Sequence, residues 1–156
     1  MIKDETTSII VDADACPSKQ DIVNVARTYN VKVFFVASYA HMTDKDLGGQ
    51  WIWVDSSKES VDLYIINHVK KHDIVVTQDI GLASMIVSRH VYCVSPRGKV
   101  YDEKEMDTIL ELRYAGYKQR RQGERTKGPK RYTEQDRQNL LHSLEKILSK
   151  LAGIQQ

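Results

Sequence analysis

Short runs of β-branched and other apolar residues recur from residue 8 to residue 95, and helix-patterned segments separate most of them. This alternation constrains the fold more than any other feature of the chain. Strands that alternate with helices form βαβ units, whose neighbouring strands are parallel. We therefore predict an α/β fold with a mostly parallel sheet flanked by helices. The predicted strands are the runs 8–14 (SIIVDAD), 31–37, 51–54, 74–77 and 91–94.

The segments between these runs carry helix signals. Pro17 suits the first position of a helix after the first strand. Ser56 or Ser57 is the expected N-cap of the next long helix, which would place Asp62 in its second turn. Gly81 opens a third helix, and the polar stretch 38–50 is expected to be a loop with room for a short helix.

The alternation of strands and helices ends after Pro96, where two helices are predicted with no strand between them. The first runs from about 102 to 115, with Gly116 as its stop. The second starts at Thr133, and Asp136 three residues later resembles a capping box. We expect a single domain, 1–156, made of an α/β core (8–95) and C-terminal helices joined by a basic loop (96–156).

Composition agrees with one ordinary core, because 41% of the 156 residues are hydrophobic. No run of about 18 apolar residues occurs, and the first residues lack the pattern of a signal peptide. We expect a cytoplasmic protein with no membrane contact. Cys16 and Cys93 are too isolated for a zinc knuckle or a disulfide framework, so reduced thiols are expected.

Acidic side chains fall where the predicted strands end. Asp12 and Asp14 follow the first strand, and Asp79 follows the fourth. The helix of Asp62 begins where the third strand ends. Because the carboxyl ends of parallel strands gather at one edge, where open α/β sheets bind ligands, we expect these four acids to meet there.

Asp62 is the most informative of them, because Val61, Ile65 and Ile66 place it beside a buried helix stripe. A buried carboxylate is costly unless it is paired or bound to a cation. Oxygen ligands favour Mg²⁺ or Mn²⁺, with Glu59 as an additional ligand. The alternative is that each Asp is a helix cap or turn former, which explains Asp12, Asp14 and Asp79 but not Asp62.

Four strings in order, DADACP, ESVDLYI, VTQDIGLA and SPRG, resemble the YaiI/YqxD (DUF188) family of uncharacterised bacterial proteins, a branch of the PIN-like fold. The resemblance covers nearly the whole chain. It implies a nuclease that holds Mg²⁺ or Mn²⁺ and cuts RNA, with Asp12, Asp62 and Asp79 at the matching positions and Asp14 and Glu59 as extra members. PIN-like enzymes commonly carry a further acid near the last core strand, where this chain has Ser95 and Arg97.

Positive charge is concentrated near the C-terminus, with Tyr114, Tyr117 and Tyr132 interleaved. Cations and aromatic rings together can bind single-stranded RNA, but an ordinary solvated loop explains them equally well. The candidate nucleic-acid-binding residues are Arg97, Lys99, Lys118, Arg120, Arg121, Arg125, Lys127, Lys130 and Arg131.

Two other functions remain open from the sequence. One is a non-catalytic nucleic-acid-binding module of PIN-like fold, which the missing late acid favours. The other is a phosphatase of the haloacid dehalogenase kind, suggested by the acids of VDADACP. Cys16 is expected to fill a tight turn rather than to react, and His41, in the loop after the second strand, to be exposed to solvent rather than to face the pocket.

Overall fold

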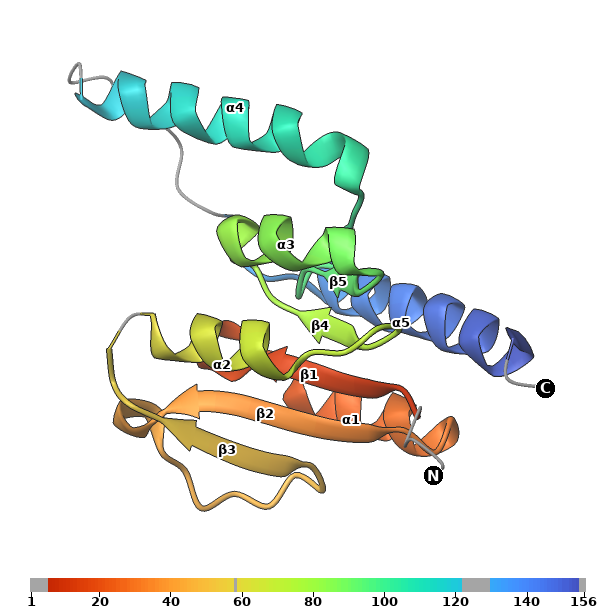
Figure 1. The fold of residues 1–156 in the computed structure, drawn as a ribbon. Coiled ribbons are helices and arrows are strands. Elements are labelled where there is room, and N and C mark those ends of the chain that lie inside the picture. The colour runs from red at the N-terminus through yellow and green to blue at the C-terminus, as the bar shows by residue number, and fades with distance from the viewer. Residues whose placement is uncertain (1–5, 58, 122–129, 155–156) are drawn as a thin grey trace.

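The computed structural model describes residues 6–57, 59–121 and 130–154. Its centre is a six-stranded sheet in the order β3-β2-β1-β4-β5-β6 (Figure 1). All neighbouring strands are parallel except β5 and β6, which are antiparallel. The predicted α/β fold with a mostly parallel sheet is confirmed. The strands are β1 (Ser8–Asp12), β2 (Lys32–Ser38), β3 (Gln50–Val54), β4 (Ile74–Val76), β5 (Tyr92–Val94) and β6 (Val100–Tyr101).

Helices cover both faces of the sheet. One face packs against α1 (Lys19–Thr28) and α5 (Glu134–Ile154) through a core that includes Phe35. The other packs against α2 (Ser60–His68) and α3 (Ile80–Ile86), while α4 (Glu103–Arg121) lies on α3. Alternate strand residues point to opposite faces, so both faces of this sheet are apolar. None of the helices in the described residues has the length and apolar character needed to cross a membrane.

Short turns of 3-10 helix follow two of the strands. Ala13–Ala15 comes directly after β1, and Tyr39–His41 comes directly after β2 within the predicted loop. Both cysteines are buried and free, as expected. Burial raises the pKa of the Cys16 thiol, so its place before a helix does not make it reactive.

Three predicted boundaries are wrong. The first helix begins at Lys19 with Ser18 as its N-cap, two residues after Pro17. The helix after β3 begins at Ser60, with Glu59 as its N-cap, so Asp62 lies in the first turn and not the second. The helix after β6 continues through Gly116 to Arg121, because Gly116 does not adopt the positive φ of a helix stop.

The C-terminal region contains one strand that was not predicted and one cap that was. β6 returns beside β5 through a tight turn in which Gly98 has φ +89°, where a side chain would collide with the backbone of Asn139. The capping box of the last helix is confirmed: Thr133 N–H donates to Asp136 Oδ2 at 2.9 Å, and Asp136 N–H donates to Thr133 Oγ1 at 3.1 Å.

Candidate functional site

The carboxyl ends of β1 and β4 form the point where the strand order reverses. β1 and β4 are neighbours, yet the chain continues from β1 to β2 on one side and from β4 to β5 on the other. In open α/β sheets such a reversal is the usual place for a ligand site, because the two following loops depart in opposite directions. Asp12 is the last residue of β1, and Asp79 lies three residues beyond the end of β4.

Thr77 links these two acids. Its hydroxyl donates to Asp12 Oδ2 at 2.9 Å and accepts the backbone N–H of Asp79 at 3.0 Å. Asp79 is also the N-cap of α3, because its Oδ1 accepts the N–H of Leu82 at 3.1 Å. The cap explanation therefore accounts for one oxygen of Asp79 and leaves the second oxygen outside the cap.

Asp62 faces the same two acids from the first turn of α2. Its pKa is raised from 3.8 to about 6, first by burial and then by the negative charges of Asp79 and Asp12, with a hydrogen bond to Asp79 adding to the shift. The charge of exposed Glu59 contributes least. Burial also raises the pKa of Asp12, the Thr77 hydrogen bond lowers it, and Asp14 and Asp79 raise it further. The structure thus brings together Asp12, Asp62 and Asp79, which we call the carboxylate cluster.

Asp14 is directed to the end of β2. Its carboxylate accepts the N–H of Ser38 at 3.2 and 3.4 Å and lies 3.2 Å from Nδ1 of His41, an exposed residue whose ring also contacts the Ser38 hydroxyl at 3.0 Å. Asp14 therefore acts on the carboxylate cluster through its charge on Asp12, while its oxygens are engaged elsewhere.

The chemistry of the carboxylate cluster suits a hard divalent cation. All its donors are oxygens, and a cation would relieve the repulsion that raises the pKa of Asp62 and Asp12. Within the described ranges, however, no three His, Cys, Asp and Glu side chains are grouped as a ready-made metal site. A shared ion would therefore require these side chains to move from the positions that they have here.

Near the last core strand, where PIN-like enzymes commonly carry a further acid, this chain forms a turn. Buried Ser95 follows β5, and its hydroxyl accepts the N–H groups of Arg97 at 3.2 Å and of Lys99 at 3.1 Å. Arg97 then binds Asp136 Oδ2 at 2.7 Å and the carbonyl oxygens of Lys130 and Arg131. The Arg97 guanidinium therefore fastens the segment before α5 to the β5–β6 turn.

The other predicted nucleic-acid contacts lie in different surroundings. Lys99 forms an ion pair with Glu105 at 2.7 Å, and Lys130 and Arg131 are exposed. The hydroxyl of Tyr132 is hydrogen-bonded to Ser18 and to the carbonyl of Pro96, both at 2.8 Å, and the guanidinium of Arg97 lies over its ring, 5.7 Å from the centroid, so the side chain is already engaged within the protein. Arg125 and Lys127 lie outside the described residues, as do the side chains of Lys118, Arg120 and Arg121.

Sequence reasoning missed Thr77 altogether. The only signal is the T-x-D spacing of Thr77 and Asp79, which is also common in ordinary turns. The pairing of His41 with Asp14 left no signal, because it depends on β2 lying beside β1.

Comparison with known proteins identifies a family that the chain matches over most of its length. The model described as "Uncharacterized BCR, YaiI/YqxD family" matches residues 10–150. The UPF0178 protein of Bacillus cytotoxicus is 53% identical over 148 residues, which are 95% of this chain and 97% of the relative. That of Halalkalibacterium halodurans is 46% identical over 146 residues, 94% and 93% of the two chains. That of Listeria monocytogenes is 48% identical over 129 residues, 83% and 87%. No solved structure matches.

Proposed function

Because the chain belongs to the YaiI/YqxD family, whose description names no activity, we infer a function from its own side chains and propose divalent-metal-dependent cleavage of RNA phosphodiester bonds at the carboxylate cluster. The observation that carries this proposal is the pKa of Asp62, raised to about 6 beside Asp79 and Asp12 at the reversal of strand order. Carboxyl groups with perturbed pKa values at the carboxyl ends of parallel strands, where the strand order reverses, are typical of functional sites. The resemblance to PIN-like nucleases supports RNA as the substrate.

The residues of the chain have distinct parts in this proposal. Asp12 and Asp79 are the principal ligands of Mg²⁺ or Mn²⁺, and Asp62 is the third. When bound, such an ion polarises a phosphoryl oxygen and lowers the pKa of a water molecule. Thr77 keeps Oδ2 of Asp12 in place, and the cap on α3 fixes the direction of the Asp79 side chain. Asp62 would hold the ion in its ionised form, because a neighbouring positive charge favours the carboxylate over the protonated acid.

A non-catalytic nucleic-acid-binding module is the second candidate. It is favoured by Ser95, which occupies the place of the late acid with its hydroxyl engaged by two backbone N–H groups. A haloacid-dehalogenase-like phosphatase is less well supported, because the second acid of its D-x-D loop would be Asp14, whose oxygens are engaged by Ser38 and His41.

The deciding experiment is cleavage of labelled single-stranded RNA by purified protein with Mn²⁺. We expect Asp12→Asn and Asp79→Asn to abolish turnover, and Asp107→Asn, at an exposed position on α4, to leave it unchanged. RNA that binds without being cut would favour the second candidate. Absence of turnover on a range of RNA and DNA substrates, or cleavage by the variants at the wild-type rate, would refute the nuclease.

A further inference from the structure

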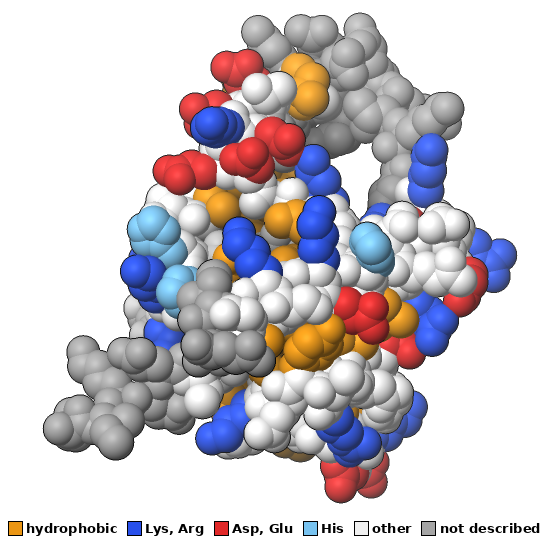
Figure 2. Space-filling view, turned by 90° about the vertical axis from the view of Figure 1, so that its right-hand side faces the viewer, with side chains coloured by type: hydrophobic (Ala, Val, Ile, Leu, Met, Phe, Trp, Pro, Cys, Tyr) orange, Lys and Arg blue, Asp and Glu red, His pale blue; other side chains and the backbone are white. Residues whose placement is uncertain are grey.

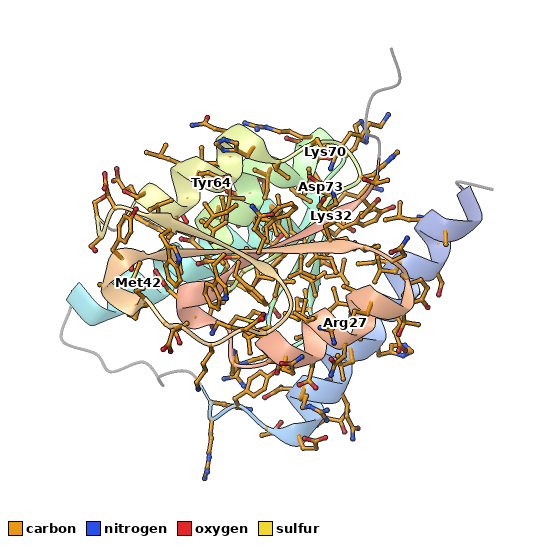
Figure 3. The ribbon with its side chains drawn as sticks, turned by 90° about the horizontal axis from the view of Figure 1, so that it is seen from below. Arg27, Lys32, Met42, Tyr64, Lys70 and Asp73 are labelled. Carbon is orange, nitrogen blue, oxygen red and sulfur yellow. The ribbon has the colours of Figure 1, made fainter. Side chains whose placement is uncertain are left out.

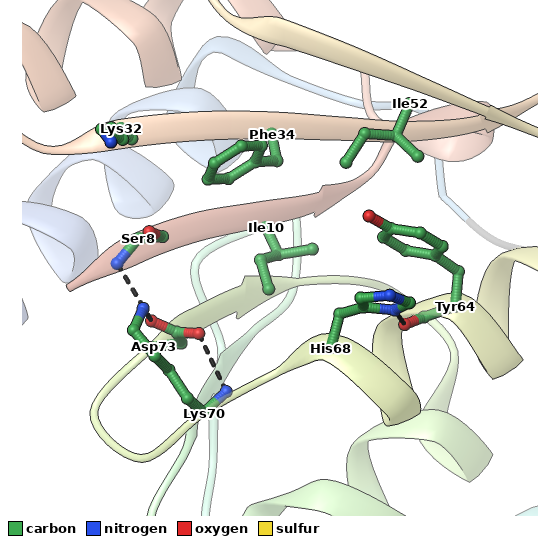
Figure 4. Close-up of a pocket in the computed structure, with 9 residues that line it drawn as sticks. All are labelled: Ser8, Ile10, Lys32, Phe34, Ile52, Tyr64, His68, Lys70 and Asp73. Carbon is green, nitrogen blue, oxygen red and sulfur yellow. Dashed lines mark hydrogen bonds and ion pairs between the residues drawn. The ribbon is translucent and has the colours of Figure 1, made fainter. Parts of the chain in front are cut away.

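A groove of about 250 Å³ opens on the α2 face of the sheet, towards the ends where the strands begin. Its floor is formed by Ile10 of β1, Phe34 of β2 and Ile52 of β3 (Figure 4). It exists because α2 has only nine residues and leaves the first half of these strands without a covering helix. Phe34 and Ile52 consequently remain half-buried. The groove is separate from the carboxylate cluster, which lies beyond the opposite ends of the strands.

The polar end of the groove carries one unpaired positive charge. Ser8 and Lys32 are direct neighbours across the β1–β2 ladder. The hydroxyl of Ser8 and the ammonium of Lys32 have no hydrogen-bond or ion-pair partner in the described part of the chain. Nearby, the ammonium of Lys70 is neutralised by buried Asp73 at 2.8 Å. Figure 3 shows Lys32, Lys70 and Asp73 gathered at this end.

The carboxylate of Asp73 does not compensate the positive charge of Lys32, because other groups already bind it. It accepts the backbone N–H groups of Ser8 and Lys70, both at 3.0 Å, in addition to the Lys70 ammonium. Phosphate oxygens accept hydrogen bonds from ammonium and hydroxyl groups, and these are the two donors available here. Charge complementarity therefore favours an anionic group beside Lys32.

The wall of the groove offers flat rings. Tyr64 and His68 are one turn apart on α2, and their rings are stacked with centroids 3.9 Å apart and planes 14° apart. His68 Nδ1 lies 2.8 Å from the carbonyl oxygen of Tyr64, which holds the imidazole in this orientation. Together with Phe34 on the floor, these rings provide the kind of surface on which bases stack in proteins that bind single strands.

We propose that this groove binds one nucleotide, with its base against Phe34, Tyr64 and His68 and its phosphate beside Lys32 and Ser8. At about 250 Å³ the groove has room for one base and not for several stacked ones, so it would hold a single nucleotide with its phosphate at the polar end. The nucleotide is either a free mononucleotide or an unpaired nucleotide of an RNA strand. Only the second source rests on the proposed function.

The test is calorimetric titration of the full chain in EDTA with AMP, adenosine, inorganic phosphate and a short single-stranded RNA. We expect AMP to bind more tightly than adenosine or phosphate alone. Phe34→Leu should weaken AMP binding roughly tenfold through lost stacking, and Lys32→Gln should reduce it to the level of adenosine. Lys45→Gln, an exposed lysine in the loop before β3, is the matched control and should change nothing.

Each outcome decides the proposal. If AMP does not bind but the RNA does, and RNA binding is weakened by the Phe34 and Lys32 substitutions, the ligand is a nucleotide within a strand. Absence of saturable binding by AMP and RNA, or equal binding by wild type and both folded variants, overturns it. Circular dichroism and unfolding midpoints establish that the variants are folded. Because EDTA removes metal, the result does not depend on the nuclease assay, and either proposal can fail alone.

Discussion

The hydroxyl of Thr77 donates a hydrogen bond to Oδ2 of Asp12 across 2.9 Å, and this contact joins the end of β4 to the end of β1. Thr77 is 1% exposed, so the bond is formed away from water. The oxygen of the Thr77 hydroxyl also accepts the N–H of Asp79. One buried hydroxyl therefore couples the positions of two members of the carboxylate cluster.

We predict that Thr77→Val weakens both the fold and the site. The hydroxyl lowers the pKa of Asp12 against the effect of burial, so its loss raises that pKa and disfavours the ionised form that a cation needs. The unpaired N–H of Asp79 should cost about 1–3 kcal/mol of unfolding free energy. Urea unfolding and Mn²⁺ titration measure the two effects, with Thr77→Ser as the control that keeps the hydroxyl. Wild-type Mn²⁺ affinity in Thr77→Val would contradict this.

Mn²⁺ binding should release a proton in mildly acidic solution. With a pKa of about 6, Asp62 is largely protonated at pH 5.5 and ionised at pH 8. A cation that binds the ionised form releases roughly three-quarters of a proton at the lower pH and almost none at the higher, and its affinity falls as the pH drops through 6. Calorimetry in buffers of different ionisation enthalpy counts these protons. Equal proton release at both pH values, or unchanged release in Asp62→Asn, would exclude Asp62 from the site.

Asp62→Asn should stabilise the metal-free protein in alkaline solution. The pKa of Asp62 is raised from 3.8 to about 6 on folding, so its favourable contribution is complete below the unfolded value and is lost as the pH rises through 6. The gain at pH 8, after allowance for solvent screening of a partly exposed group, is about 1 kcal/mol. Thermal unfolding at pH 8 and pH 4 compares the two proteins. A stability difference that is the same at both pH values would argue against repulsion as its cause.

The exposed pair Lys130 and Arg131 offers a test of RNA contact by the basic segment. Replacing both with Gln should lower affinity for single-stranded RNA at low salt and reduce the slope of log affinity against log salt by about 1.4, or roughly 0.7 per lost phosphate contact. Fluorescence anisotropy over a salt series measures the slope, with Lys45→Gln as the control. An unchanged slope would indicate that these cations are only solvated.

Figure 2 shows the end of the molecule where the strands begin, on which Lys and Arg side chains are spread among acidic ones and form no single patch.

The sequence predicted the elements of this protein well where a pattern repeats over several residues. The strands of the parallel sheet were found because each contains a short run of apolar residues, most of them buried in β1, β2, β4 and β5 and half-buried in β3. The capping box of Thr133 and Asp136 was found because its residues are local in sequence. β6 was missed because a strand of two residues has no detectable period. The extension of α4 beyond Gly116 was missed because glycine costs a helix only about 1 kcal/mol and need not end it.

The sequence by itself determined that acids follow β1 and β4 and begin α2, since these places depend on local pattern. Only the tertiary structure decided how each of them is used. Asp12, Asp62 and Asp79 face one another because β4 lies beside β1, whereas Asp14 turns to Ser38 and His41 because β2 lies on the other side. The physical reason is that the hydrophobic periodicity of the sequence indicates which face of its own helix or strand a residue occupies. The residues that it contacts in other elements depend on the order of the strands in the sheet.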